Sequence, residues 1–95
     1  MTPLSQSDRP RLPSGVRTRF DEARGTWLLL APERTLKLDE IGAAILGEID
    51  GERTLAEIID ALAARYAASR DEIAADVEGF LTALIERRMV EVAEE

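Results

Sequence analysis

The sequence contains no cysteine and no histidine. Without cysteine, the chain cannot form a disulfide, a thiolate metal site or a thiol nucleophile. Without histidine, it lacks the commonest general base and the commonest zinc ligand. A chain of 95 residues forms one domain at most. We therefore expect a small non-catalytic domain with no catalytic residue, no metal and no cofactor.

Long apolar runs and excess basic charge are also missing. The longest uninterrupted apolar run has five residues, Trp27 to Ala31, which is too short to span a membrane. The N-terminus lacks the basic and apolar regions of a secretory signal, so a cytoplasmic protein without membrane contact is the expectation. Twelve Lys and Arg face nineteen Asp and Glu, a net charge of −7. Such an acidic domain is a poor candidate for binding nucleic acid through phosphates.

Proline is concentrated at the beginning of the chain. Residues 1–14 hold Pro3, Pro10 and Pro13, which are three of the four prolines. The same segment has three serines and few large apolar side chains. This composition predicts a flexible tail or linker over residues 1–14, followed by a folded domain over residues 15–95.

Three short segments after Gly15 have the composition or alternation of strands. Residues 16–20 alternate imperfectly and are rich in strand formers, and residues 27–31 form an apolar run of strand length. Residues 35–38 alternate cleanly, with Leu36 and Leu38 on one face. Turn residues separate the segments, at 21–25 and at Pro32–Glu33. The pattern predicts an antiparallel meander of three strands.

The period then changes to that of a helix. Ile41, Ile45 and Ile49 recur every four residues and predict a helix with one buried stripe. Asp39 is the expected N-cap, and Asp50–Gly51 the expected end of this helix.

Two capping boxes mark the next helices. Thr54 with Glu57, and Ser69 with Glu72, have the spacing in which a hydroxyl and a carboxylate satisfy the first free amides. Apolar side chains follow on one face of each helix: Leu55, Ile58, Ile59, Leu62 and Tyr66, then Ile73, Val77, Phe80, Leu81, Leu84 and Ile85. Arg87 and Arg88 are expected in the last turn of the third helix, before a brief final strand at residues 89–92.

These elements predict an α+β, winged-helix-like fold, in which a three-stranded antiparallel sheet precedes a three-helix bundle. A winged helix suggests a DNA-binding or dimerising regulator as one alternative function. The predicted recognition helix begins with Asp71 and Glu72, however, and phosphates would repel these carboxylates. Catalysis has no better support, because no histidine is present to activate a serine.

The third predicted strand permits two interpretations. Arg34 and Lys37 are the kind of charged side chains that block unwanted pairing at a sheet edge. The same strand can instead bind an extended peptide, which adds as a further strand with alternate side chains entering a groove. The sequence pattern alone does not choose between them.

Several segments resemble those of a known family. The chain resembles the PqqD family, the peptide chaperones of pyrroloquinoline quinone (PQQ) biosynthesis, in Gly15–Arg17, Arg24–Arg34, Leu38–Gly42, Asp50–Thr54 and Glu57–Ile59. The resemblance covers residues 11–92, and residues 38–59 are shared more widely with recognition elements for ribosomally made, modified peptides (RiPPs). It implies a chaperone that binds the precursor peptide PqqA and presents it to the radical SAM enzyme PqqE. Members of this family sometimes occur fused to PqqC, so the chain is expected to be such a domain or to act beside PqqC.

The resemblance also implies a site. The peptide is expected to add to the third strand and to lie beside the third helix. The strand residues are Arg34, Thr35, Leu36, Lys37 and Leu38, and the helix residues are Asp76, Val77, Phe80, Leu81 and Leu84. The last four also fit a buried helix face by their spacing, so core and contact roles stay open for them. Gly79 is unfavourable within a helix, and we hypothesise that its missing side chain lets a peptide or a neighbouring helix approach closely.

Overall fold

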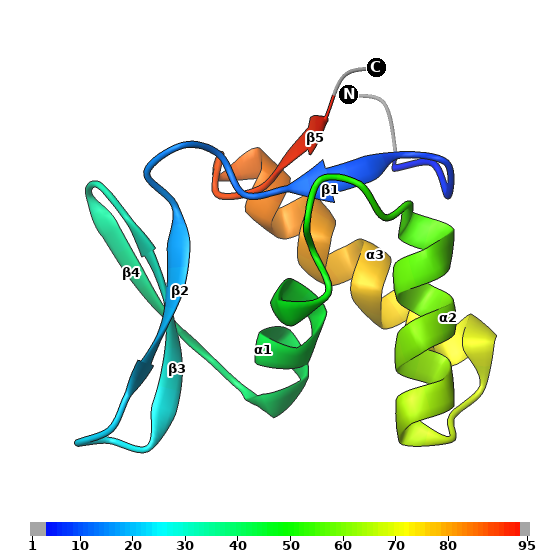
Figure 1. The fold of residues 1–95 in the computed structure, drawn as a ribbon, viewed down its shortest axis with the longest axis horizontal. Helices are drawn as coiled ribbons and strands as arrows, with labels where there is room; N and C mark the ends of the chain where they lie inside the picture. The colour runs from blue at the N-terminus through cyan, green and yellow to red at the C-terminus, as the bar shows by residue number, and fades with distance from the viewer. Residues whose placement is uncertain (1–3, 94–95) are drawn as a thin grey trace.

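The computed structural model describes residues 4–93 and contains two small sheets and three helices (Figure 1). The strands are β1 (Arg9–Arg11), β2 (Arg17–Asp21), β3 (Thr26–Ala31), β4 (Arg34–Leu38) and β5 (Glu91–Ala93). The helices are α1 (Glu40–Gly47), α2 (Leu55–Tyr66) and α3 (Arg70–Glu86). The predicted α+β order, with a three-stranded meander before three helices, is confirmed.

Strands β2, β3 and β4 form an antiparallel sheet in sequence order. The β2–β3 turn is closed by the Asp21 carboxylate, which accepts a hydrogen bond from the Ala23 amide at 3.1 Å. Gly25 completes this turn with φ +63°, a conformation that glycine adopts without steric cost. Only Pro32 and Glu33 separate β3 from β4. Short turns of this kind keep each strand beside its sequence neighbour, as the meander prediction requires.

The beginning and end of the chain pair with each other. Strand β1 is antiparallel to β5, with Pro10 opposite Val92. Pro10 is fully buried, and its carbonyl accepts a hydrogen bond from the Gly51 amide at 3.1 Å. The flexible tail predicted over residues 1–14 is therefore wrong for residues 4–14; residues 1–3 lie outside the described part. The final strand is confirmed, two residues later than predicted at its start.

Helix α1 begins where it was predicted to begin but ends earlier. Asp39 is its N-cap, and the Asp39 carboxylate accepts a hydrogen bond from the Gly42 amide at 2.6 Å. The helix ends at Gly47, so Ile49 follows it instead of completing an isoleucine stripe. Ile45 is buried, whereas Ile41 is 42% exposed. The buried face of α1 is formed by Gly42, Ala44, Ile45 and Leu46, which shares only Ile45 with the predicted stripe.

The two longer helices begin and end differently from each other. Thr54 and Glu57 form the predicted capping box of α2. Ser69 precedes α3 as its N-cap but makes no side-chain hydrogen bond to the helix, so the second capping box is wrong. Helix α3 ends at Glu86. Arg87 and Arg88 follow the last turn instead of lying in it, and Arg88 adopts a left-handed conformation with φ 61°.

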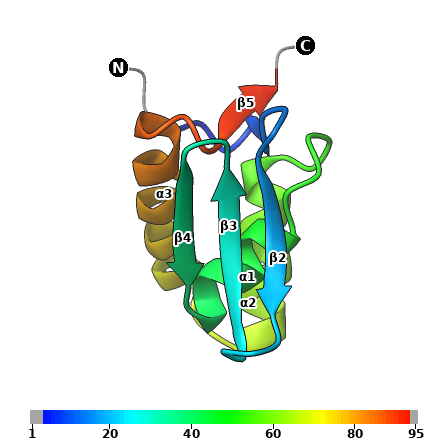
Figure 2. The ribbon, with the colours of Figure 1, turned by 90° about the vertical axis from the view of Figure 1, so that its left-hand side faces the viewer.

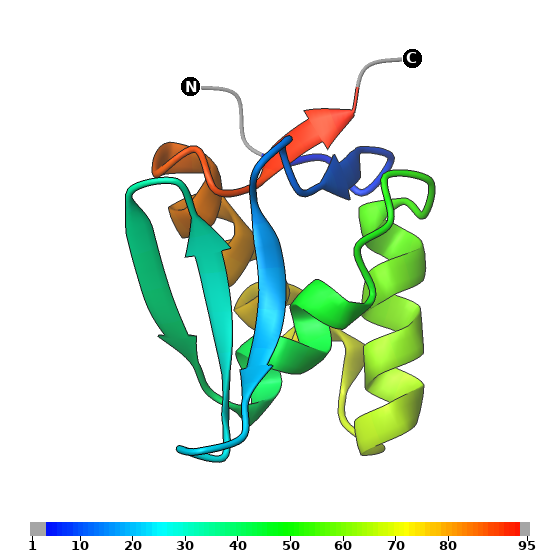
Figure 3. The ribbon, with the colours of Figure 1, turned by 60° about the vertical axis from the view of Figure 1, so that its left-hand side comes forward.

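The core lies between the inner face of the three-stranded sheet and the helices (Figures 2 and 3). Its buried apolar side chains are Leu29, Leu38, Ala44, Ile45, Leu46, Leu55, Ile58, Ile59, Leu62, Val77, Leu81, Leu84, Met89 and Val90. Each large member contributes about 1.5–3 kcal/mol when fully buried. Within residues 4–93, no helix is both long and apolar enough to cross a membrane.

Candidate functional site

Strand β4 is one of the two edges of the three-stranded sheet (Figure 2). The turn of Pro32 and Glu33 places Ala31 opposite Arg34. Residues that flank a two-residue turn form a hydrogen-bonded pair, and backbone groups along a strand alternate between its two sides. Arg34, Leu36 and Leu38 therefore direct their backbone groups toward β3, while Thr35 and Lys37 direct theirs to the free edge. This edge can accept an added strand.

Side chains of β4 divide between the two faces of the sheet. Leu38 is buried and Leu36 is half-buried, on the inner face that meets the helices. Thr35 and Lys37 are exposed on the outer face, and Arg34 is exposed at the start of the strand. The alternation predicted from the sequence is confirmed. A strand added here would meet apolar side chains on one face and a hydroxyl and an ammonium on the other.

Helix α3 lies on the β4 side of the molecule and contributes both core and surface (Figure 2). Val77, Leu81 and Leu84 are buried, with exposed fractions of 1%, 0% and 4%. They hold α3 in place, and no ligand can touch them without rearrangement of the core. Asp76 is exposed and Phe80 is half-buried against the core cluster. The accessible part of the predicted site is therefore Arg34 to Lys37 with Asp76 and Phe80.

One contact at this site involves a residue that the sequence reasoning did not select. A β-carbon built on Gly42 would lie 3.1 Å from the Phe80 ring and 3.0 Å from the Asp39 carboxylate. The missing side chain of Gly42 thus lets the ring of α3 pack directly against α1, beside the end of β4. A glycine in the first turn of a helix is unfavourable for helix formation, and that cost is the signal in the sequence.

Gly79 does not have the packing role that we considered for it. A β-carbon at Gly79 would meet no atom within 4 Å among the described residues. Close approach of a neighbouring helix is therefore wrong as an explanation. Gly79 is exposed and adjacent to Phe80, so the approach of a bound peptide remains a prediction.

The electrostatics of the site are those of solvated surface groups. Neither Arg34 nor Lys37 forms an ion pair within residues 4–93, which leaves both cations available to an acidic ligand. The two carboxyls with displaced pKa values lie elsewhere, before and at the start of α2. Hydrogen bonds from the Arg53 and Glu52 amides lower the pKa of Asp50, and one from the Thr54 amide lowers the pKa of Glu57. No group of metal-ligating side chains occurs in the described part of the chain.

The part of the inner face toward β2 offers a competing surface. A hollow of about 270 Å³ lies between β2, β3 and α1, bordered by Thr18, Trp27, Ala43 and Gly47 among others. Trp27 and Phe20 are each 43% exposed, and their rings meet edge to face at 5.3 Å. Sequence reasoning did not select this hollow. Trp27 is the only tryptophan in the chain, so its indole reports any ligand that binds on this side.

The chain is similar to known proteins in both sequence and structure. Residues 26–90 match the family "Coenzyme PQQ synthesis protein D (PqqD)". A PqqA binding protein of Rhodopseudomonas palustris is 48% identical over 97% of this chain and 90% of its own length. A bifunctional coenzyme PQQ synthesis protein C/D of Methylorubrum extorquens is 46% identical over 95% of this chain, which spans 24% of that protein. The solution structure of the PqqD part of Methylobacterium extorquens PqqCD, described as a functional, stand-alone RiPP recognition element, superposes with a TM-score of 0.81. It is 45% identical to this chain, and the match covers 93% of this chain and 94% of that one.

Proposed function

The chain belongs to the PqqD family of coenzyme PQQ synthesis proteins, and from this premise we propose that it binds the precursor peptide PqqA by strand addition and presents it to PqqE. The observation that carries the proposal is the free edge of the three-stranded sheet along β4, which lies on the same side of the molecule as α3. The chain itself has no catalytic role in this proposal.

Strand addition is supported by what the edge offers. Thr35 and Lys37 present backbone donors and acceptors with no partner strand within the described residues. Backbone hydrogen bonds provide affinity without demanding one peptide sequence, and alternate side chains provide register. Leu36 and Phe80 supply half-buried apolar surface for that purpose. Arg34 and Lys37 supply charge that favours acidic residues of the peptide.

The benefit to PqqE is effective concentration. A flexible peptide held on a folded adaptor reaches the enzyme as part of one complex. Once the adaptor has bound the enzyme, the encounter of the peptide with the enzyme is intramolecular. This role needs no cofactor on the adaptor. It also fits a chain that is either free or joined to PqqC, as in the Methylorubrum relative.

Reversal of the two β4 charges tests the binding step. We expect the double variant Arg34→Glu/Lys37→Glu to weaken PqqA binding, because it replaces two unpaired cations with carboxylates at the proposed site. Arg65→Glu/Arg87→Glu is the matched control, since it makes the same charge change at exposed positions of α2 and beyond α3. PqqA affinity is measured by anisotropy of labelled peptide, and product formation by PqqE is followed with each variant. Equal affinity for both double variants would contradict a charged contribution from β4.

A further inference from the structure

The outer face of the three-stranded sheet has a composition unlike the rest of the molecule. Arg17 lies opposite Leu30, and Arg19 lies opposite Leu28, in the register of β2 and β3. Leu29 between the two leucines is fully buried on the inner face, so Leu28 and Leu30 point outward. We call Arg17, Arg19, Leu28 and Leu30 the outer-face patch. Its two leucines are half-buried and its two arginines are exposed.

The charge of this region is opposite to that of the chain. Residues 16–38 carry five Lys and Arg against three Asp and Glu, whereas the remaining residues carry seven against sixteen. In a protein of net charge −7, this cationic region is where an acidic partner is repelled least. An acidic surface that approaches the helices is repelled, while one that approaches the sheet is attracted.

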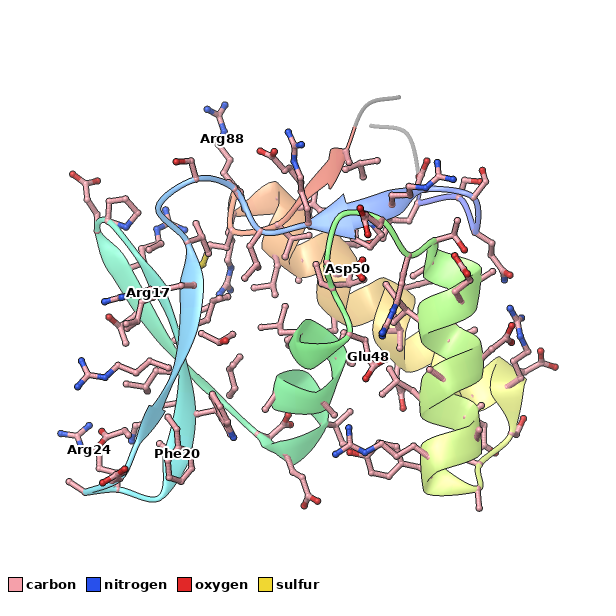
Figure 4. All side chains as sticks on the ribbon, viewed as in Figure 1. Arg17, Phe20, Arg24, Glu48, Asp50 and Arg88 are labelled. Atoms are coloured by element: carbon pink, nitrogen blue, oxygen red, sulfur yellow. The ribbon has the colours of Figure 1, made fainter. Side chains whose placement is uncertain are left out.

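The arginines of the patch have no acidic partner, unlike four other arginines of the described residues, Arg11, Arg24, Arg53 and Arg70. Arg11 pairs with Glu91, Arg53 with Glu48, and Arg70 with Asp60. Neither Arg17 nor Arg19 forms an ion pair within residues 4–93. Figure 4 shows Arg17 directed away from the helices, and Figure 2 shows no described element over this face of the sheet.

We propose that the outer-face patch is the surface on which the modifying enzyme docks, through an acidic region of that enzyme. The inference rests on the proposed adaptor function and adds the enzyme's contact surface to it. An adaptor needs two separate surfaces if peptide and enzyme are to be bound together. The free edge of β4 serves the peptide, with Leu36 on the inner face and Lys37 at the β4 border of the outer face, whereas Arg17 and Arg19 lie on the opposite edge strand.

The composition of the patch suits such a contact. Leu28 and Leu30 are bordered by Arg17 and Arg19 on β2 and by Thr35 and Lys37 on β4. This arrangement matches the usual order of protein interfaces, in which a drier centre is bordered by polar groups. Arginine is also among the residues that contribute most to binding. Charge complementarity acts mainly on the association rate and weakens with salt. We therefore expect enzyme docking to be salt-sensitive.

Charge reversal in the patch separates enzyme docking from peptide binding. Arg17→Glu/Arg19→Glu is compared with Arg65→Glu/Arg87→Glu, which makes the same change of charge on the helical side. Biolayer interferometry measures association with PqqE at low and physiological salt, and anisotropy measures PqqA binding. We expect the patch variant to lose at least tenfold in PqqE affinity, mainly by slower association, and to keep PqqA affinity within twofold. Arg17→Gln/Arg19→Gln, expected to give a smaller loss, replaces the reversal if that variant does not fold.

Four outcomes would overturn the inference, and a fifth would contradict only the proposed function. Unchanged PqqE affinity in both patch variants would exclude the patch as the docking surface. Failure of the unaltered chain to bind PqqE would do the same. Loss of self-association in place of enzyme binding would assign the patch to a second copy, and patch-dependent binding of duplex DNA would assign it to nucleic acid. A chain that binds PqqE through the patch but does not bind PqqA would instead contradict the proposed function and leave the docking surface standing.

Discussion

Replacement of Thr35 by proline tests whether a peptide backbone pairs with β4. The Thr35 amide faces the free edge, because backbone groups alternate along the strand and those of Arg34, next to the two-residue turn, point toward β3. Proline cannot donate a hydrogen bond, but it is tolerated in an edge strand where the amide points away from the sheet. The Thr35 side chain is exposed, so its loss removes little packing. The variant therefore removes one donor to the peptide and leaves the fold in place.

The size of the effect follows from that one donor. A neutral hydrogen bond contributes about 0.5–1.5 kcal/mol net. A loss near 1 kcal/mol corresponds to roughly fivefold weaker binding, since about 1.4 kcal/mol is tenfold. Because the backbone pairing with β3 is retained, we expect the free energy of unfolding to change by less than about 1 kcal/mol.

The assay is a titration of labelled PqqA followed by anisotropy, with thermal unfolding measured in parallel. Thr35→Val is the matched control, because it keeps the backbone donor and a β-branched side chain suited to a strand. Valine should bind like the unaltered chain, and proline should bind about fivefold more weakly. If the proline variant is folded and binds PqqA as tightly as the valine variant, strand addition at Thr35 is refuted.

Three further changes probe the surroundings of the site. Gly42→Ala should lower stability by about 1–3 kcal/mol, measured by chemical denaturation, because the new β-carbon crowds Phe80 and the Asp39 cap; an unchanged midpoint would show that the ring moves aside freely. Gly79→Ala should raise stability by about 1 kcal/mol, because its β-carbon meets nothing. It should also weaken PqqA binding if the peptide passes over α3, and unchanged anisotropy would remove that role. The lowered pKa of Glu57 means that its contribution to stability is present above the ordinary value of 4.5 and is lost as the pH falls through the folded-state pKa. Thermal unfolding of Glu57→Gln should therefore depend less on pH in this acidic range, and identical pH profiles would contradict the capping role.

Local signals made most of the fold predictable. The strands, their turns and the Thr54–Glu57 capping box depend on residues close in sequence, and the structure confirms them. The pairing of β1 with β5 joins residues about 80 positions apart, and each strand has three residues. Such short strands have no periodicity of their own, so the proline-rich composition of the first segment dominated the prediction.

The ends of the helices were harder to predict, because two of them use residues that are unfavourable in the conformation they adopt. Ala67 and Arg88 adopt left-handed conformations with φ 51° and 61°, where glycine is the usual residue. The amides of Ala68 and Met89 then bond back to Ala63 and Leu84, and these bonds hold the chain in the strained turn. Tertiary packing selects these ends, so the sequence near them contains no glycine to mark them.

The strand of the candidate site was predictable from the sequence, whereas the contacting residues of its helix were predictable only in part. The edge position of β4 follows from the order of the strands, which local turns determine. On α3, however, burial and ligand contact demand the same apolar spacing, so Val77 and Leu81 could not be distinguished from Phe80 by sequence. Only the structure separates them, because it shows the Phe80 ring packed over Gly42, where no side chain occupies the space.

Amide chemical-shift titration of the labelled chain with synthetic PqqA tests the central claim most directly. We expect shifts concentrated at Arg34–Leu38 and around Asp76 and Phe80, saturating at one peptide per chain. The Trp27 indole, which lies on the middle strand and borders the hollow toward β2 and α1, should shift less than the β4 amides. Saturating shifts at Trp27 and Gly47 with none along β4 would place the peptide in the competing hollow and contradict strand addition at β4.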